Sequence, residues 1–348
     1  MTSQLKQVFS NPAYLTPEIA NEIANEIMDG HLTSAQIGGF LITMKLLGKE
    51  TQPPYIASIA KAMKKASLKI DIDLPLVDIV GTGGDGQDTF NVSTAASIVA
   101  AGAGCKIAKH GSRASSSACG SADVLETLGC KLENVTPDVA TKIIKESNFC
   151  FLFAQLYHPA MKAVAGPRRE LGVRTIFNLY ILYLLTFSLG PLTNPANPKR
   201  MVVGVFSKDI GMIMAKSLQL VGVERAWVVC GAIGLDEISP EGSTNVWELE
   251  NNTIIEKVVS PKDFGLPEHP LSAVRGGNAE ANASTMNQLL DGTLSGPVLD
   301  FVLLNSAAVL YIAGLAKSLP EGVALARQSI TSGKAKAELL KFAKLTQL

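Results

Sequence analysis

The densest group of residues able to do chemistry runs from Asp78 to Thr94 and reads DIVGTGGDGQDTFNVST. Its glycines permit positive φ angles and let the backbone approach a ligand closely. A helix that begins after such a turn directs backbone N–H groups and the positive end of its dipole toward an anion. The segment therefore predicts a binding site for a phosphate-type ligand.

Two familiar nucleotide motifs do not fit this turn. Gly81, Gly83 and Gly86 match G-x-G-x-x-G, but a dinucleotide site needs an acidic residue about 20 positions later, where this chain has CKIAK at residues 105–109. A Walker A loop is excluded because no Gly-Lys-Ser/Thr closes the turn. A purely structural glycine turn would leave the polar residues Asn91, Ser93 and Thr94 unexplained.

A second polar segment, KHGSRASSS, spans Lys109 to Ser117. Lys109 and Arg113 would supply positive charge, and the serines with their backbone N–H groups could surround phosphate oxygens. Taken alone, such a segment is typical of a solvated loop. Beside the glycine turn on a parallel sheet, it predicts the second half of one anion site.

A third segment places two adjacent carboxylates, Asp236 and Glu237, after a glycine turn in CGAIGLDEIS. Adjacent acidic residues are commonly a surface pair. Mg²⁺, however, binds through one or two carboxylates together with water and phosphate oxygens. Next to a polyphosphate site, this pair predicts magnesium binding.

The pattern around these motifs indicates an α/β fold with a mainly parallel central sheet. Short apolar runs predict strands at 76–80, 105–109, 149–154, 201–206 and 225–230, and helices fit between them at 93–102, 121–128, 137–147 and 210–221. Residues 244–249 and 253–259 predict a hairpin, and helices are expected at 281–290, 298–319 and, with breaks, 322–347. Ligands of such sheets collect at the carboxyl ends of the strands.

Residues 1 to about 70 differ, because their apolar residues recur at spacings of three and four, which predicts helices only. Thr33 and Ser34 are candidates for a helix N-cap, and Gly48 for a helix stop. We expect a helical subdomain over residues 1–72 and an α/β domain over residues 73–348.

Composition excludes several classes of partner. The 348 residues include 31 Lys and Arg against 31 Asp and Glu, so no net charge favours nucleic acid. The apolar stretch between Thr175 and Leu192 is too short and interrupted for a membrane span, so we expect no membrane partner. Five scattered cysteines and the lack of a secretory pattern indicate buried thiols and a cytoplasmic protein.

The three segments, in this order, resemble anthranilate phosphoribosyltransferases, whose patterns are GTGGDG with TxNxST, KHGNR with paired serines, and GLDE. Further matches are RRELG at 168–172, RTIFN at 174–178, GPLTNP at 190–195 and GGNAE at 276–280, with Asn282 following. The resemblance covers nearly the whole chain. It implies a small all-helical subdomain, joined by residues near 170–195 and hinged to the α/β domain, and a homodimer formed through the helical part.

The resemblance also implies transfer of the phosphoribosyl group of phosphoribosyl pyrophosphate (PRPP) to anthranilate, with Mg²⁺ as cofactor, in tryptophan biosynthesis. Ser93, Asp236 and Glu237 would serve the metal, and Gly81, Ser112 and Arg168 would face anthranilate. Lys109, Arg168 and the two acidic residues are the catalytic candidates. The residues implied for PRPP are Gly81, Gly84, Asp85, Thr89, Asn91, Ser93, Thr94, Lys109, Ser112, Ser115, Ser116, Ser117 and Ser121.

Four departures separate this chain from the family pattern. Ser112 replaces Asn, Gln155 replaces Pro, and Cys230 replaces His. Nine residues, Tyr180 to Ser188, also stand inside the RTIFN-LLGPLTNP run, and their removal restores it. Because codon degeneracy permits splice-like signals at both ends, we hypothesise that this insertion is translated intron sequence.

Two other functions share parts of these patterns. A pyrimidine-nucleoside phosphorylase has a similar architecture and a glycine-rich phosphate loop, but it binds one phosphate and gives the acidic pair less purpose. A catalytically silent phosphosugar-binding relative would explain the departures.

Overall fold

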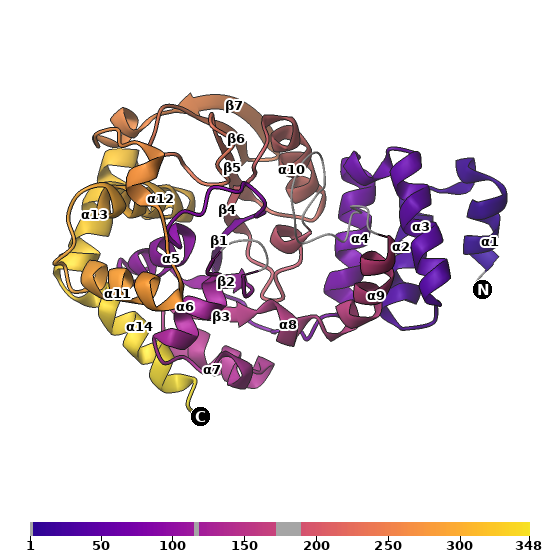
Figure 1. Ribbon diagram of the computed structural model, residues 1–348, viewed down its shortest axis with the longest axis horizontal. Helices are drawn as coiled ribbons and strands as arrows, with labels where there is room; N and C mark the ends of the chain where they lie inside the picture. Colours follow the sequence, from indigo (N-terminus) through magenta and orange to yellow (C-terminus); the bar gives the residue numbers. More distant parts are fainter. Residues whose placement is uncertain (1–2, 115–117, 172–188) are drawn as a thin grey trace.

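The computed structural model describes residues 3–114, 118–171 and 189–348. A helical part and a larger α/β part lie side by side, with the N-terminus at the outer end of the helical part (Figure 1). The helices of the first part are α1 (Ser3–Ser10), α2 (Pro17–Met28), α3 (Ser34–Leu46) and α4 (Pro53–Ala66). This confirms the all-helical start expected from the apolar spacing. Our boundary between residues 72 and 73 stays a prediction.

Local sequence sets the ends of these helices. The Thr33 hydroxyl accepts from the backbone N–H of Gln36, whose side chain accepts in return from Thr33, so α3 begins with a capping box. Gly48 follows α3 with φ near +61°, a conformation that glycine adopts without steric cost. Helix α9 (Lys162–Leu171) packs on α3, so a later part of the chain joins the helical part.

The sheet of the α/β part has the strand order β3-β2-β1-β4-β5-β6-β7. Strands β1 to β5 are parallel, while β6 and β7 form the predicted antiparallel hairpin. The strands are β1 (Val77–Gly81), β2 (Ile107–Gly111), β3 (Phe149–Phe153), β4 (Arg200–Gly204), β5 (Arg225–Gly231), β6 (Thr244–Glu250) and β7 (Thr253–Val259). After β3 the chain returns to the other side of β1, and such a switch in strand order is where open sheets bind ligands.

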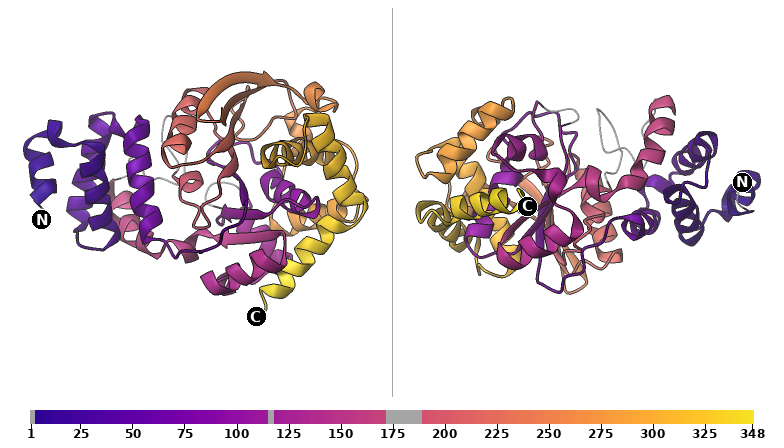
Figure 2. Two further views of the ribbon diagram at one scale, coloured as in Figure 1. Left: turned by 180° about the vertical axis from the view of Figure 1, so that it is seen from behind. Right: turned by 90° about the horizontal axis from the view of Figure 1, so that it is seen from below.

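Helices cover both faces of the sheet (Figure 2). The helices of the α/β part are α5 (Val92–Gly102), α6 (Ser121–Thr127), α7 (Pro137–Glu146), α8 (Ala154–Tyr157), α10 (Lys208–Leu220), α11 (Ala279–Leu290), α12 (Pro297–Ala313), α13 (Leu319–Thr331) and α14 (Lys334–Leu345). Short 3-10 helices are Pro12–Tyr14, Lys49–Thr51, Leu132–Asn134, Pro159–Met161, Gly190–Leu192, Pro261–Phe264 and Leu271–Val274.

Alternating side chains of one strand belong to two different hydrophobic cores. Val202 faces the core that contains α5 and α12, whereas Met201 and Val203 face the core shared with α10 and the N-terminal helices. The continuous apolar run of Met201, Val202 and Val203 therefore buries both faces of β4. Because α4 packs against α10, the helical part is fastened to the sheet through this second core.

Most predicted elements lie within one or two residues of the observed ones, but the helix predicted at 298–319 was too long. It ends at Ala313, because Gly314 takes a φ near +79° as its C-cap, and α13 begins only at Leu319. All five cysteines are buried and free, as predicted. In the part of the chain that is described, no helix has the length and apolarity to cross a membrane.

Candidate functional site

The three predicted segments meet in one cavity of about 420 Å³ at the carboxyl ends of β1 and β2. A volume of this size suits a small-molecule ligand. The glycine turn follows β1, the second polar segment follows β2, and the acidic turn follows β5. The residues predicted from sequence that line the cavity are Gly81, Gly84, Asp85, Thr89, Asn91, Ser93, Lys109, Ser112, Ser121, Asp236 and Glu237.

The glycine turn and the acidic turn are in direct contact. The Gly83 N–H donates to Asp236 Oδ2 at 2.6 Å. A Cβ at Gly81 would lie 2.4 Å from the same oxygen, so glycine is required there by the close approach of the carboxylate. Gly204 at the end of β4 plays a similar part, because its Cβ would overlap the Asp236 backbone.

Both carboxylates of the acidic turn are buried, unlike those of a typical surface pair. Asp236 and Glu237 have exposed fractions of only 8% and 9%. Burial raises the pKa of Glu237 to about 8, although the nearby Lys109 opposes that shift. Burial also raises the pKa of Asp236, and the neighbouring Asp85 and Glu237 raise it further. Two buried carboxyl groups in mutual repulsion form a donor set that a divalent cation would stabilise.

The donors around this pair are hard oxygens, as Mg²⁺ prefers. Ser93 lies close enough to Glu237 to lower its pKa by a hydrogen bond. Residues 3–114, 118–171 and 189–348 contain no group of three His, Cys, Asp or Glu residues that could hold a metal by themselves. Ser93, Asp236 and Glu237 therefore fit Mg²⁺ if phosphate oxygens and water complete its coordination.

Lys109 is almost fully buried at the floor of the cavity. Its Nζ donates to the carbonyl of Ile79 at 2.6 Å and to Ser93 Oγ at 3.3 Å. Burial lowers its pKa, and the carboxylates of Asp78, Glu237 and Asp236 oppose that shift. The Lys109 ammonium group is thus held in place by the Ile79 carbonyl and the Ser93 hydroxyl rather than lying on a flexible exposed side chain.

Asp78, the first residue of the glycine segment, connects that segment to His110 of the second polar segment and to Asn194. Its carboxylate accepts from the His110 backbone N–H at 3.3 Å and from Asn194 Nδ2 at 2.8 Å. The same Asn194 nitrogen donates to the carbonyl of Ala108. Burial raises the pKa of Asp78 to about 6, and the Lys109 charge opposes that shift.

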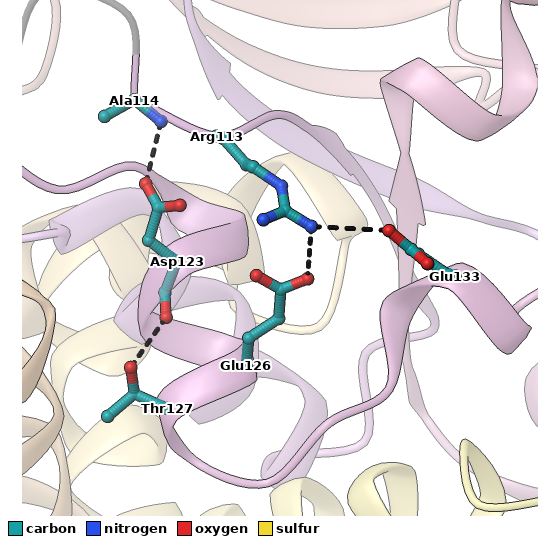
Figure 3. Close-up of polar contacts among 6 residues, drawn as sticks. All are labelled: Arg113, Ala114, Asp123, Glu126, Thr127 and Glu133. Carbon is teal, nitrogen blue, oxygen red and sulfur yellow. Dashed lines mark hydrogen bonds and ion pairs between the residues drawn. The ribbon is translucent and has the colours of Figure 1, made fainter.

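Asp123 on α6 holds the end of the second polar segment through backbone hydrogen bonds (Figure 3). Its Oδ2 accepts from the backbone N–H groups of Ala114 and Gly120, both at 2.8 Å. Arg113 departs from the expectation that it supplies charge to a phosphate, because its guanidinium pairs with Glu126 at 2.8 Å and Glu133 at 3.6 Å.

Thr94 is fully buried and does not line the cavity, although it was predicted to hold PRPP. Its hydroxyl instead donates to Ser121 Oγ at 2.9 Å, and Ser121 lines the cavity. Ser115, Ser116 and Ser117 lie outside the described residues. Arg168 belongs to α9, but its side chain is also outside the described part, so its predicted role stays open.

His110 lines the cavity, and its ring packs against His158 with the centroids 5.1 Å apart. His110 Nδ1 lies 3.2 Å from the carbonyl of Gly190, which assigns the proton to Nδ1. Burial lowers the pKa of His110 to about 3 and of His158 to about 4, so both rings are neutral. Among the residues that the structure describes, neither side chain's Nε2 has a hydrogen-bond partner.

Comparisons with known proteins agree with this architecture. The helical bundle domain of a glycosyl transferase family matches residues 3–67, and the α/β domain of a glycosyl transferase family matches residues 73–336. The anthranilate phosphoribosyltransferase of Schizosaccharomyces pombe is 45% identical over 327 residues, covering 92% of this chain and 90% of the relative.

Two solved structures extend the similarity to three dimensions. The anthranilate phosphoribosyltransferase of Thermus thermophilus has a TM-score of 0.89 and 41% identity, with full coverage of both chains. The Saccharomyces cerevisiae enzyme in complex with PRPP and Mg has a TM-score of 0.88 and 33% identity, covering 99% of this chain and 97% of its own. These similarities, together with the fold and the cavity, show that the chain belongs to the anthranilate phosphoribosyltransferase family.

Proposed function

We propose that this chain transfers the phosphoribosyl group of PRPP to anthranilate, giving N-(5-phosphoribosyl)anthranilate and pyrophosphate, in tryptophan biosynthesis. The meeting of the glycine turn, the Lys109 segment and the acidic turn in one cavity is the main support. The family relationship and the PRPP and Mg complex of the yeast relative support the same reaction.

In the proposed reaction, the amine nitrogen of anthranilate bonds to C1 of the ribose, the C1–O bond to pyrophosphate breaks, and the amine loses a proton. An aromatic amine is neutral at pH 7, so no strong base is required. The larger demand is to stabilise the negative charge of the departing pyrophosphate. Lys109 and the backbone N–H groups of the glycine turn meet this demand, because they are fixed before the reaction starts.

We assign Mg²⁺ to Ser93, Asp236 and Glu237, where it would neutralise pyrophosphate charge. PRPP is assigned to the glycine turn, Thr89, Asn91, Lys109, Ser121 and the serines at 115–117, with Thr94 acting through Ser121. Anthranilate is assigned to Gly81, Ser112 and Arg168. His110 is assigned to holding the site to Gly190 through Nδ1, and burial lowers its pKa to about 3, which makes its Nε2 a weak base for removing a proton.

The test is a fluorescence assay of anthranilate consumption by the purified chain with PRPP over a Mg²⁺ titration. We expect Mg²⁺-dependent turnover. In the double variant Asp236→Ala, Glu237→Ala, turnover should fall at least about a hundredfold, or ~3 kcal/mol of transition-state stabilisation. Glu256→Ala, an exposed acid on β7, is the control.

Each competing function predicts a different result. Phosphate-dependent cleavage of uridine or thymidine, without use of anthranilate, would show a pyrimidine-nucleoside phosphorylase. Thermal stabilisation by PRPP and Mg²⁺ without any turnover would show a silent phosphosugar-binding relative.

We also propose a homodimer formed through the helical part. Support comes from exposed apolar side chains on its outer elements: Phe9 and Tyr14 are each 39% exposed and Leu46 is 81% exposed. Sedimentation should give a dimer for the unmodified chain and a monomer for Leu46→Glu.

A cytoplasmic location is proposed from the five buried free thiols, which suit a reducing compartment, and fractionation of the source cells tests it.

A further inference from the structure

Asn282, at the start of α11, does not line the cavity but touches a residue that does. Its side chain is 4% exposed. Its Oδ1 accepts from the Gly277 N–H at 2.7 Å, and its Nδ2 donates to Asn91 Oδ1 at 2.8 Å. Asn91 lines the cavity at the beginning of α5. A buried amide bonded at both ends has one orientation that satisfies it.

The chain of bonds continues from Asn91 to the second polar segment. Asn91 Nδ2 donates to the carbonyl of Cys119 at 3.0 Å. The two ends of this chain are backbone groups whose roles cannot be exchanged, since the Gly277 N–H only donates and the Cys119 carbonyl only accepts. The direction of every bond between them is therefore fixed, and so are the orientations of both side-chain amides.

Backbone contacts hold Asn282 and Asn91 at this separation. The Phe90 N–H donates to the carbonyl of Val274, and the Gly276 N–H donates to the carbonyl of Asp88, both at 2.9 Å. A Cβ at Gly276 would lie 2.7 Å from the Thr89 carbonyl oxygen, so the segment around Gly276 packs directly against the glycine turn. The segment that precedes α11 is thus a fixed support for the glycine turn.

We infer that Asn282 is a positioning residue for PRPP: it fixes the Asn91 amide so that Nδ2, not Oδ1, is the group available on the Cys119 side. Nδ2 carries two hydrogens, and the Cys119 carbonyl takes one. A phosphate oxygen accepts from an amide N–H but is repelled by an amide oxygen. This inference rests on the proposed function, because it takes PRPP as the ligand.

The test is a double-mutant cycle with the dissociation constant of PRPP, measured by calorimetry in saturating Mg²⁺, as the readout. Asn282→Ala should raise the dissociation constant about tenfold. Asn91→Ala should do so by at least as much. Because Asn282 acts through Asn91, the double variant should bind within about twofold of Asn91→Ala alone. Asn278→Ala, which removes the exposed N-cap of the same helix, should leave binding unchanged.

Asn282→Asp provides a second variant of nearly the same size. It keeps the bond from Gly277 and removes the Nδ2 donor to Asn91, together with the side-chain hydrogen bond between Asn282 and the Cys119 thiol, so it too should weaken PRPP binding. In the Asn91→Ala background its effect should disappear, whereas an effect of the added charge alone would persist there.

Four outcomes overturn the inference. Unchanged binding in Asn282→Ala would show that Asn91 is positioned without it. Multiplied effects in the double variant would show that Asn282 acts by another route, as would a loss in Asn282→Asp that persists without Asn91. A wild-type chain that binds no PRPP overturns the proposed function as well, whereas the other outcomes leave that function intact.

Discussion

The backbone N–H of Gly83 is bonded to Oδ2 of Asp236 at 2.6 Å, which joins two turns that lie 153 positions apart in the sequence. The bond restrains the position of the Asp236 carboxylate. A carboxylate that is held against the glycine turn cannot move toward a phosphate without releasing that turn. The position of the acidic pair and the shape of the glycine turn are therefore coupled.

Gly81→Ala tests this coupling. Its Cβ would lie 2.4 Å from Asp236 Oδ2, so the carboxylate must move. We expect the Mg²⁺ concentration for half-maximal activity to rise about tenfold, while the melting temperature falls by only a few degrees. Gly38→Ala in α3 is a matched control, since its Cβ would be at an ordinary 3.7 Å from Leu171. An unchanged Mg²⁺ requirement would show that the acids are not coupled to the turn.

The parts of this site that are local in sequence were predictable, and those that depend on distant neighbours were not. Asp78 to Thr94 carries its glycines, its hydroxyls and the helix start in one run, so the phosphate site was evident. The burial of Asp236 depends on Gly204 of another strand, whose missing Cβ makes room for the acidic turn. Similarly, Asn282 meets Asn91 across 191 positions, and no periodicity encodes that contact.

The fold shows the same division. The hairpin of β6 and β7 was predictable because asparagine readily adopts the positive φ that a tight turn requires. Asn251 and Asn252 both have a positive φ in the structure. The end of α12 was missed because apolar residues continue beyond Gly314, and that pattern outweighed the glycine in the prediction. The ion pairs of Arg113 were also missed, because only the fold brings Glu126 of α6 and Glu133 of the next 3-10 helix to its guanidinium.

The neutral pair His110 and His158 predicts acid sensitivity. Burial lowers their pKa values to about 3 and about 4, below the usual 6.5. Below pH 6.5 the unfolded chain therefore binds more protons than the folded one. Their contribution to stability is complete above that pH. As pH falls it is lost by about 1.4 kcal/mol per pH unit for each histidine, down to about pH 4 for His158 and about pH 3 for His110.

Urea denaturation at pH 7 and pH 5 tests this for His158→Gln, which removes one titrating group. Its free energy of unfolding should fall less between the two pH values than that of the unmodified chain. His31→Gln, at an exposed position, should change nothing. If the variant loses stability as steeply as the unmodified chain, His158 does not titrate in the way we expect.

Ser112 predicts an effect on anthranilate. It lines the cavity where the family pattern has Asn, and its shorter side chain offers a hydroxyl in place of an amide. We expect Ser112→Asn to lower the KM for anthranilate severalfold while leaving the KM for PRPP unchanged. Ser284→Asn, on an exposed turn of α11, is the control. An equal or higher anthranilate KM in Ser112→Asn would mean that position 112 does not contact this substrate.

The insertion Tyr180 to Ser188 lies outside the described residues, so its prediction comes from the sequence. These nine mostly apolar residues interrupt a motif whose two halves are otherwise complete. Apolar residues added between a helical segment and a substrate-side loop must either displace packed neighbours or remain exposed, and both are unfavourable. We expect the chain without residues 180–188 to be more soluble and roughly tenfold more active, a gain of about 1.4 kcal/mol in transition-state stabilisation.

Purification of both forms and measurement of kcat/KM for anthranilate tests the prediction, and sequencing of transcripts tests the intron hypothesis. Transcripts that lack these nine codons would support that hypothesis. Equal activity of the two forms, or transcripts that all retain the nine codons, would instead show the segment to be a genuine part of the enzyme.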